Sequence, residues 1–344
     1  MSQQDFLIKK ASVEYKSPSN IAFVKYWGKK EDQIPQNASL SMTLSNCFTQ
    51  TKVNFEHSDC FIIKSLLLDG KSNELFLKKI RKFIDKNFES FKFLNNYSLS
   101  IETHNSFPHS SGIASSASGF SALVMCLMEF EAKLNGSQID LKKASNLSRL
   151  GSGSASRSLF NGFAHWGESP LLDSSNLYAS EIDYKLNIKD CIAIVSRAQK
   201  KTSSSAGHGL MESNPFAEVR YKNAARNLKL MDKALQNLDF FSAGEVIEAE
   251  AMELHALMMM STPSFILLEE ESIGIIKLIK EFREESGLPI FFTIDAGPNI
   301  HILYLDENKT QVEKFIEDKI KAKTIDLIFD EKGSGPELLE SFYE

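Results

Sequence analysis

The segment Ser115–Leu134 restricts the fold of this chain more than any other part of it. Apolar and small residues occupy most positions around a helix drawn through this segment, and charged residues appear only toward its end. A helix that is apolar on every side must be buried, because no face of it suits water. The segment therefore predicts a central helix enclosed by other layers of the fold, with the polar, glycine-bearing loop 105–114 leading into it.

Strands and helices follow one another irregularly along the rest of the chain. Alternating or β-branched runs predict strands, and apolar residues at helical spacing predict helices. The expected strands are Ala11–Tyr15, Ala38–Phe55 (as paired strands with a break near Ser45–Asn46), Phe61–Leu68, Tyr97–Thr103, Cys191–Arg197, Pro289–Ile294, His301–Leu305 and Thr324–Phe329. The other expected helices are Asn73–Phe88, Asp140–Leu150, most of Ala217–Met260, Ile273–Glu285 and Thr310–Lys321. This mixed order predicts an α+β fold rather than a regular βαβ array.

Length and charge narrow the class of protein. A chain of 344 residues is long for one compact core and suits two packed lobes. Its composition, 42% hydrophobic and 24% charged, is ordinary for a soluble globular protein. The formal net charge of −6 gives no general attraction for nucleic acid, although basic residues can still gather around a small anion.

The lack of a recognisable targeting signal and the spacing of the cysteines lead us to expect a cytoplasmic protein. Residues 1–11 are polar and charged, without the apolar run of a secretory signal, and no apolar run approaches membrane-spanning length. The cysteines are scattered and form no CxxC pair: Cys47, Cys60, Cys126 and Cys191. We therefore expect reduced thiols rather than a disulfide framework or a zinc site.

The loop Pro108–Phe120 is the most informative candidate for a ligand site. Its sequence, PHSSGIASSASGF, combines glycines and small hydroxyl residues at the start of the predicted buried helix. Backbone N–H groups at such a position bind phosphate, and the helix dipole adds positive potential. The hydroxyls of Ser115 and Ser116 would reach a phosphate oxygen or Mg²⁺. A serine-rich cap on a buried helix explains the same residues without a ligand.

The segment Ser17–Lys30 offers positive charge. Lys25, Lys29 and Lys30 flank two aromatic residues and a glycine, an arrangement that suits a multiply charged anion. Taken on spacing alone, solvated lysines are the more ordinary interpretation.

Two further segments carry one charged residue each in a setting that suits catalysis. Gly151–Ser158 (GSGSASRS) presents Arg157, whose planar guanidinium matches a carboxylate, after small residues that let a ligand approach the backbone. Thr293–Asn299 (TIDAGPN) places Asp295 where an apolar strand ends in a Gly-Pro turn. A surface arginine and an aspartate that caps its own turn are the ordinary alternatives.

Several other patterns carry no function. The Gly-Lys-Ser triplet after Asp69 lacks the earlier glycine of a P-loop, because Ser65 stands there, so we expect a turn. No dinucleotide-binding GxGxxG and no HExxH zinc motif occurs. We expect His255 and the run Met258–Met260 to be packing residues of a helix.

Five segments, in one order along the chain, resemble the GHMP small-molecule kinase superfamily and, within it, the diphosphomevalonate decarboxylase family. They are Asn20-Ile-Ala with Lys25-Tyr-Trp-Gly-Lys29, Asn37–Ser45, Phe107-Pro with Gly112–Phe120, Gly151–Phe160, and Asp295–Asn299. The Lys-Tyr-Trp-Gly-Lys and Gly-Ser-Gly-Ser-Ala-x-Arg-Ser segments separate decarboxylases from ordinary kinases of the superfamily.

This resemblance implies a set of site residues. Asp295 matches the catalytic aspartate, Lys25 the lysine beside it, and Arg157 the group that binds the carboxylate of the substrate. The residues expected to bind or line the substrate are Tyr26, Lys29, Ser152, Ser154, Asn20 and Ser204. The residues expected to bind ATP are Asn105, Ser106, Ser110, Gly112, Ala114, Ser115 and Ser116, with Ser116 also a ligand of Mg²⁺.

The resemblance also implies an architecture and an activity. The expected fold has two GHMP-kinase lobes with a deep cleft between them, a ribosomal-protein-S5-like lobe over residues 1–184 and a ferredoxin-like lobe over residues 185–344. The expected reaction is the ATP- and Mg²⁺-dependent decarboxylation of mevalonate 5-diphosphate to isopentenyl diphosphate, with release of ADP, phosphate and CO₂. A homodimer is expected, with no nucleic acid or membrane as partner.

Two departures from the family pattern leave alternatives open. The phosphate loop has His109-Ser110-Ser111 where relatives commonly have Thr-Ala-Ala, and Ser205 stands where some bacterial relatives have an arginine that grips the diphosphate. A preference for mevalonate 5-phosphate therefore stays possible, as does a kinase that phosphorylates the hydroxyl without decarboxylation. A binding protein without activity would be expected to lack the loop or the aspartate, and a serine hydrolase is unsupported because there is no G-x-S-x-G elbow.

Overall fold

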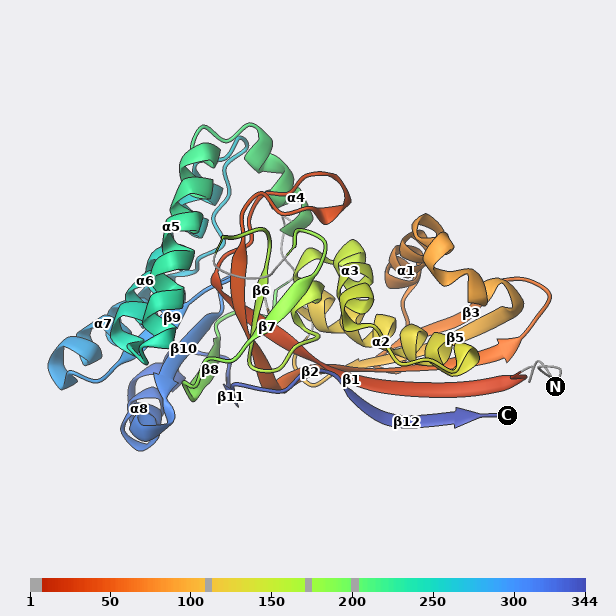
Figure 1. The fold of residues 1–344 in the computed structure, drawn as a ribbon. Helices are drawn as coiled ribbons and strands as arrows, with labels where there is room; N and C mark the ends of the chain where they lie inside the picture. Colours follow the sequence, from red (N-terminus) through yellow and green to blue (C-terminus); the bar gives the residue numbers. More distant parts are fainter. Residues whose placement is uncertain (1–7, 109–112, 171–174, 199–203) are drawn as a thin grey trace.

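A computed structural model describes residues 8–108, 113–170, 175–198 and 204–344 (Figure 1). Within these ranges the larger sheet has the strand order β12-β1-β2-β5-β3-β4, and β6 pairs with both β2 and β7. Its strands are β1 (Lys10–Val24), β2 (Ser39–His57), β3 (Ile62–Leu68), β4 (Lys71–Ser72), β5 (Tyr97–Asn105), β6 (Phe163–Trp166), β7 (Ala179–Ile182) and β12 (Glu337–Tyr343). β3 and β5 are parallel, and the other pairs are antiparallel.

A second, antiparallel sheet has the order β11-β8-β10-β9. Its strands are β8 (Ile188–Ile194), β9 (Ile290–Thr293), β10 (Ile300–Leu305) and β11 (Asp326–Glu331). The helices that accompany it are α5 (Ala217–Gln236), α6 (Phe240–Met259), α7 (Glu270–Ser286) and α8 (Lys309–Phe315), after the short α4 (Ser204–Gly209). Figure 1 shows α5 to α8 gathered at one end of the molecule, opposite the chain termini.

The central helix expected from the sequence is present as α2 (Ser115–Asn135). Every residue from Ala117 to Met128 is buried, because the helix packs on β1 and β2 and against α3 (Leu141–Gly151). Asp140 caps α3 by accepting hydrogen bonds from the backbone of the first helical turn. The remaining helix of this lobe, α1 (Glu74–Lys86), is capped in the same way by Asn73.

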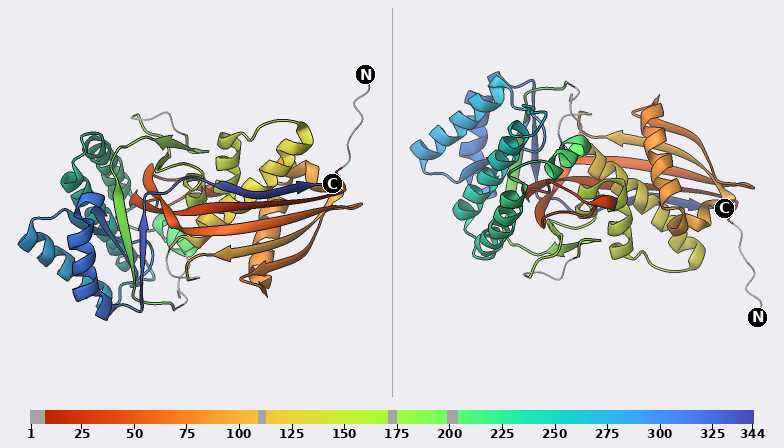
Figure 2. Two further views of the ribbon diagram at one scale, coloured as in Figure 1. Left: turned by 90° about the horizontal axis from the view of Figure 1, so that it is seen from below. Right: turned by 90° about the horizontal axis from the view of Figure 1, so that it is seen from above.

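The two longest strands, β1 and β2, reach from one lobe into the other (Figure 2). The first half of β1 contributes Val13 and Tyr15 to the core around α2. Its last residues, including Phe23 and Val24, belong to a second core shared with α5, α6 and the smaller sheet. The chain is therefore continuous through the larger sheet up to the point where the two lobes meet.

The structure differs from the expected strands in several places, including a longer β1 and the strands β6 and β7, which were not expected. Ala38–Phe55 does not fold as strands paired with each other: from Ser39 on it belongs to the single strand β2, whose pairing with β1 is interrupted near Ser45–Asn46. The backbone N–H groups there donate to the buried carboxylate of Asp330, which stabilises the irregularity. The strand β12 was not expected at all.

The strand β12 bears on the predicted division of the chain at residue 184. It follows the smaller sheet in sequence but pairs with β1 at the edge of the larger one. The boundary itself stays a prediction. The turn expected at the Gly-Lys-Ser triplet is confirmed, since Asp69 and Gly70 have positive φ and connect β3 to the short β4.

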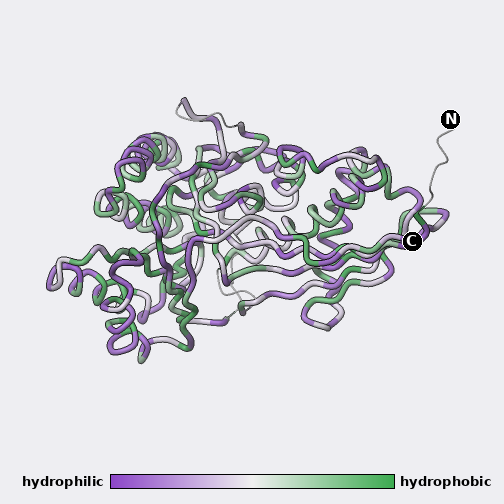
Figure 3. The backbone as a smooth tube through the Cα atoms, turned by 60° about the horizontal axis from the view of Figure 1, so that its bottom comes forward, coloured by the Kyte–Doolittle hydropathy of each residue, from purple (hydrophilic) through white to green (hydrophobic). Residues whose placement is uncertain are grey.

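Hydrophobic and hydrophilic residues are interspersed along the long strands and most helices rather than collected in one stretch (Figure 3). This pattern fits elements that bury one face and expose the other. In the part of the chain that the structure describes, no helix is long and apolar enough to cross a membrane.

Candidate active site

A buried lysine and a carboxylate from opposite lobes form the centre of the candidate site. Lys25 follows the end of β1, and its Nζ lies 2.8 Å from Oδ1 of Asp295, just beyond β9. The side chain of Lys25 is 2% exposed and that of Asp295 26%, so the lysine is enclosed while the carboxylate keeps some access to solvent. The two residues that the family resemblance implied to lie side by side are therefore in contact, and their catalytic roles stay a prediction.

The protein environment favours an ionised Asp295. Burial by itself would raise the pKa of this carboxyl group, but the charge of Lys25 and its hydrogen bond outweigh burial and lower the pKa. His301 and Arg157 act in the same direction. Burial lowers the pKa of the Lys25 ammonium, and Asp295 opposes that shift. The arrangement therefore keeps a carboxylate ready to accept a proton or a hydrogen bond.

The turn after β9 fixes the position of Asp295. The backbone oxygen of Asp295 accepts the N–H of Gly297 at 2.7 Å, and Nε2 of His255 lies 3.1 Å from the same oxygen. His255 is on α6 and is buried, as expected, but it contacts the site instead of serving only as a packing residue. Its position in an apolar helix gave no signal of this contact.

Arg157 lies at the end of a short 3₁₀ turn, Gly153–Arg157, and is 2% exposed. Its guanidinium donates to Oδ1 of Asn20 at 3.4 Å and to the hydroxyl of Ser39. Burial lowers the pKa of Arg157 to about 10, which leaves it charged at neutral pH. Among the described residues no carboxylate forms an ion pair with it. A buried guanidinium with only neutral partners is well suited to bind an anionic ligand.

The loop after Lys25 forms a second region of positive potential. Lys29 Nζ contacts Oε1 of Gln33 at 2.9 Å and Oγ of Ser205 at 3.1 Å. The hydroxyl of Tyr26 is buried and has no hydrogen-bond partner in the described structure. A Cβ atom on Gly153 would lie 2.7 Å from the Tyr26 ring, so the small residue there permits this close approach.

Serine residues connect the Arg157 segment to the start of α2. The hydroxyls of Ser116 and Ser152 lie 3.1 Å apart. Asn20 donates to the backbone oxygen of Ser154 at 3.2 Å, which ties the same segment to β1. Ala114 precedes α2 in a left-handed conformation (φ 36°), and both Ser115 and Ser116 are half-buried.

The remaining predicted residues are placed less directly. Asn105 is buried at the end of β5 and accepts from Thr49 Oγ1 at 2.6 Å, and the same threonine hydroxyl contacts Ser118 of α2. Ser106 bonds to the backbone of β2. Ser204 is exposed at the start of α4. Ser110 and Gly112 lie outside the described residues.

Sequence reasoning did not single out two residues that contact this centre. Ser39 holds the guanidinium of Arg157, and the quoted segment Asn37–Ser45 was the available signal for it. His208 packs against the rings of Tyr26 and Trp27, with centroids 4.4 and 4.6 Å apart, and its Nδ1 accepts the N–H of Gly28. No spacing of the histidines pointed to His208.

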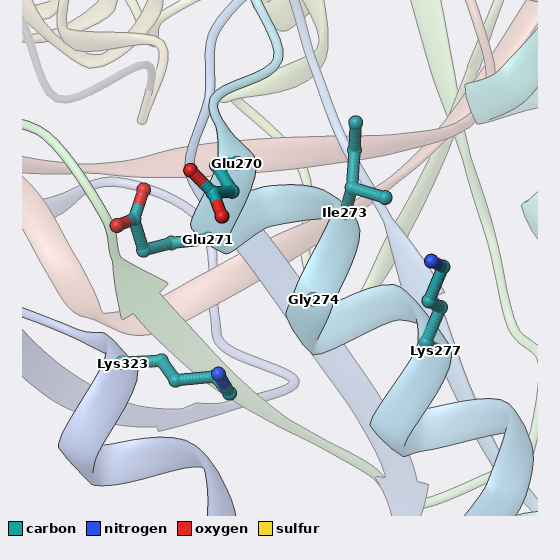
Figure 4. A pocket seen from close by; sticks show the side chains of 6 residues that line it. All are labelled: Glu270, Glu271, Ile273, Gly274, Lys277 and Lys323. Atoms are coloured by element: carbon teal, nitrogen blue, oxygen red, sulfur yellow. The ribbon is translucent and has the colours of Figure 1, made fainter.

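A separate hollow of about 270 Å³ lies on the smaller lobe (Figure 4). It is lined by Glu270, Glu271, Ile273, Gly274, Lys277 and Lys323. None of these residues belongs to the converging set described above, and both signs of charge are present. We therefore place the candidate active site at the junction of the lobes and not in this hollow.

Solved structures share this architecture. Mevalonate diphosphate decarboxylase from Staphylococcus aureus superposes with a TM-score of 0.84 at 32% identity, over 96% of this chain and 98% of that one. The corresponding enzyme from Enterococcus faecalis gives a TM-score of 0.81 at 29% identity, over 96% and 99%. A further relative, MDDEF, was solved in complex with MVAPP, AMPPCP and magnesium, with a TM-score of 0.82 at 29% identity, over 96% and 99%. The class is therefore settled as the mixed α+β, two-domain fold with GHMP-like domains.

Sequence comparisons narrow the class to one family. Residues 17–177 match the model of the diphosphomevalonate decarboxylase-like N-terminal domain, and residues 191–338 match the mevalonate 5-diphosphate decarboxylase C-terminal domain. Diphosphomevalonate decarboxylase of Debaryomyces hansenii is 32% identical over 91% of this chain and 87% of its own length. That of Candida albicans is 33% identical over 88% and 86%. The chain belongs to the diphosphomevalonate decarboxylase family, a family of carboxy-lyases.

Proposed function

We propose that this protein catalyses the ATP-dependent decarboxylation of mevalonate 5-diphosphate to isopentenyl diphosphate, releasing ADP, phosphate and CO₂. The observation that carries the proposal is the contact of Lys25 with Asp295 at 2.8 Å, across the junction of the lobes. Arg157 lies near enough to lower the pKa of the same carboxyl group. One carboxylate and two cations thus lie close together, and a substrate with a tertiary hydroxyl and a carboxylate needs such a group of charges.

The first step activates a poor leaving group. Asp295 orients or deprotonates the tertiary hydroxyl of the substrate. The oxygen of that hydroxyl bonds to the γ-phosphorus of ATP, and the bond from this phosphorus to the ADP oxygen breaks. Lys25 stabilises the ionised Asp295 and the anionic oxygens near it. This role needs hydrogen-bond reach more than a raised pKa, which agrees with the lowered pKa of Asp295.

The second step removes phosphate and CO₂ together. The carbon–oxygen bond breaks with its electron pair leaving on phosphate, and the bond to the carboxylate supplies the pair that forms the alkene. Arg157 would bind the carboxylate through two N–H donors and hold it in the orientation that elimination needs. Its contacts with Asn20 and Ser39 fix the guanidinium before substrate arrives.

The diphosphate of the substrate would bind beside the segment Gly151–Ser158, which carries Arg157. Ser152 and Ser154 belong to the segment that carries this arginine, the Tyr26 ring packs against Gly153 of it, and the buried Tyr26 hydroxyl has no partner in the described structure. Lys29 would add its charge from the loop after Lys25. Binding energy from this remote group supports alignment at the reacting carbon. Asn20 and Ser204 complete the set of residues proposed to line the substrate.

ATP would bind at the start of α2. Ser115 and Ser116 open a long buried helix, whose first N–H groups and dipole favour phosphate. The described residues contain no cluster of three His, Cys, Asp or Glu side chains suited to a metal. Mg²⁺ commonly keeps phosphate and water ligands and takes few from protein, so a hydroxyl such as that of Ser116 fits a metal carried by ATP. When bound, Mg²⁺ neutralises charge on the phosphates. Asn105, Ser106 and Ala114 are proposed to complete the nucleotide site with Ser110 and Gly112.

One assay tests the proposed function. Purified protein is incubated with ATP, Mg²⁺ and mevalonate 5-diphosphate, and ADP and CO₂ are measured together. We expect equal amounts of the two products and none without ATP. ADP without CO₂ would establish a kinase instead, and absence of both products would refute the proposal. Mevalonate 5-phosphate in a parallel reaction tests the monophosphate alternative, which Ser205 raises by placing a hydroxyl near Lys29.

Because Ser205 carries no charge, we expect binding of the diphosphate to depend largely on the positive charge of Lys29. We expect Lys29→Ala to raise KM for mevalonate 5-diphosphate about tenfold and to change kcat by less than about threefold, as loss of one charged hydrogen bond predicts. Steady-state kinetics measure both constants. Lys30→Ala is the matched control, since Lys30 is exposed on the same loop, and its KM should stay near that of the parent. Equal KM values for the two variants would remove Lys29 from the diphosphate site.

We further propose a homodimer located in the cytoplasm, as the family resemblance implies. Cys47, Cys60, Cys126 and Cys191 are all free thiols, which fits a reducing compartment. Sedimentation of the purified protein at several concentrations tests the oligomeric state, and a monomer throughout would contradict the dimer.

A further inference from the structure

Helix α6 contacts the backbone at both members of the central pair. Glu250 Oε2 accepts the backbone N–H of Lys25 at 2.8 Å. One and a half turns later, His255 lies 3.1 Å from the backbone oxygen of Asp295. A single rigid element therefore holds the main chain of two residues that come from different lobes.

The carboxylate of Glu250 is fully buried and is used by four donors. Oε2 accepts from Lys25 N and from Arg220 Nη2 at 2.6 Å. Oε1 accepts from Arg220 Nη1 at 2.8 Å and from Asn227 Nδ2 at 2.7 Å. Arg220 on α5 is itself fully buried, and its Nη2 also donates to the backbone oxygen of Lys25 at 2.9 Å. The ion pair thus grips both the N–H and the C=O of Lys25.

We propose that Arg220 and Glu250 are positioning residues for catalysis: by fixing the Lys25 backbone from α5 and α6, they set its Nζ against Asp295. The inference rests on the proposed roles of Lys25 and Asp295. Neither Arg220 nor Glu250 touches the reacting atoms. Their effect on the reaction passes through the main chain of Lys25.

A buried ion pair is a costly way to join two helices. Desolvation of both charges offsets most of their attraction, and apolar residues of similar size would often pack as well or better. Such a pair gains its value from direction, because it allows one geometry and excludes others. A displacement of about 1 Å at a reacting centre can cost about 10²-fold in rate, so a rigid grip on Lys25 has a direct catalytic benefit.

Charge supplies a second link between Glu250 and the site. Glu250 favours the charged form of Lys25 and so raises its pKa, in the same direction as Asp295 and against burial. The charged groups that act on Lys25 or sense it from neighbouring elements are Asp295, Glu250, Arg157, Arg220 and Asp190. Removing the charge of Glu250 would lower the pKa of Lys25, so the ammonium would be lost at lower pH.

Glu250→Gln and Glu253→Gln form a matched pair of variants. Both remove a carboxylate that pairs with Arg220, but Glu253 makes no contact with Lys25 and receives Arg220 Nη1 at 2.8 Å. In Glu250→Gln, the new NH₂ group must face two donors whichever way the amide turns. We expect kcat per folded enzyme to fall about 10- to 100-fold with KM within about threefold. The alkaline limb of kcat should also move to lower pH. Glu253→Gln should stay within about threefold of the parent at every pH.

Hydrogen exchange tests the positioning without using activity. The peptide containing Lys25 should lose at least tenfold in protection in Glu250→Gln but not in Glu253→Gln, while peptides from α2 stay protected in both. If neither variant turns over because the parent itself releases no CO₂, the proposed function fails while the exchange result still reports the grip. Unchanged protection at Lys25 would overturn the inference. Equal losses of kcat in Glu250→Gln and Glu253→Gln, with the same dependence of kcat on pH in both variants, would overturn it as well.

Arg220→Lys provides the test if Glu250→Gln does not fold. It keeps a positive charge beside Glu250 but loses the forked contact that also reaches the Lys25 oxygen. We expect a fall in kcat of about tenfold with the same KM, and an undiminished kcat in this folded variant would count against the positioning role.

Discussion

Asp295→Asn should lower kcat by at least about 10³-fold while the affinity for mevalonate 5-diphosphate changes little. The amide keeps the shape of the side chain but cannot accept the proton of the tertiary hydroxyl, and it loses the ionic contact with Lys25. Binding depends mainly on remote phosphate and carboxylate contacts, so it should survive. Single-turnover measurement of ADP and CO₂ gives the rate of chemistry, and calorimetric titration gives the affinity.

Asp306→Asn is a suitable control for this loss. Asp306 is exposed on the same lobe and pairs with Lys189 at 3.1 Å. Neither residue belongs to the proposed site. Its kcat should match that of the parent. If Asp295→Asn retained near-full turnover, the proposed base would be wrong, and the contact with Lys25 would have to be explained as structural.

Arg157→Ala should lower kcat/KM by about 10³-fold through both a lower kcat and a higher KM. The change removes a buried cation proposed to bind the carboxylate that leaves as CO₂, so both ground-state binding and alignment are lost. A buried charged contact of this kind is worth several kcal/mol, which corresponds to this range of rates. Steady-state kinetics of CO₂ release measure both constants.

Arg157→Lys separates charge from geometry. Lysine keeps a positive charge but cannot offer two parallel N–H donors or reproduce the contacts with Asn20 and Ser39. We expect partial recovery of KM and little recovery of kcat relative to Arg157→Ala. An alanine variant whose KM and kcat both match the parent would exclude Arg157 from the carboxylate site.

Local patterns in the sequence predicted the parts of the fold and site that depend on short-range chemistry. The apolar segment Ser115–Leu134 had to be a buried helix, and α2 extends over the same residues within one position. Asp295 was expected at the end of an apolar strand, and β9 ends two residues before it. The convergence of Lys25 with Asp295 came from resemblance, because 270 residues separate them and no local pattern encodes that contact.

Other features were missed because tertiary partners override the local pattern. A strand was expected over Ala11–Tyr15, yet β1 extends to Val24 and passes through the polar residues Ser17, Ser19 and Asn20. Those polar groups are buried but satisfied, for example by Ser17 donating to Ser121 at 2.6 Å and Ser19 to the Ile113 oxygen at 2.9 Å. The strand β12 is exposed and acidic, so its residues lack the pattern of a buried strand.

The path of β1 limits how the two lobes can move. This strand is hydrogen-bonded within the larger sheet, enters the shared core with Phe23 and Val24, and delivers Lys25 to α6. A hinge between the lobes would have to shear that strand and also the returning β12. Entry of substrate and departure of products should therefore proceed by rearrangement of short connecting segments, while the strand that leads into Lys25 keeps its position.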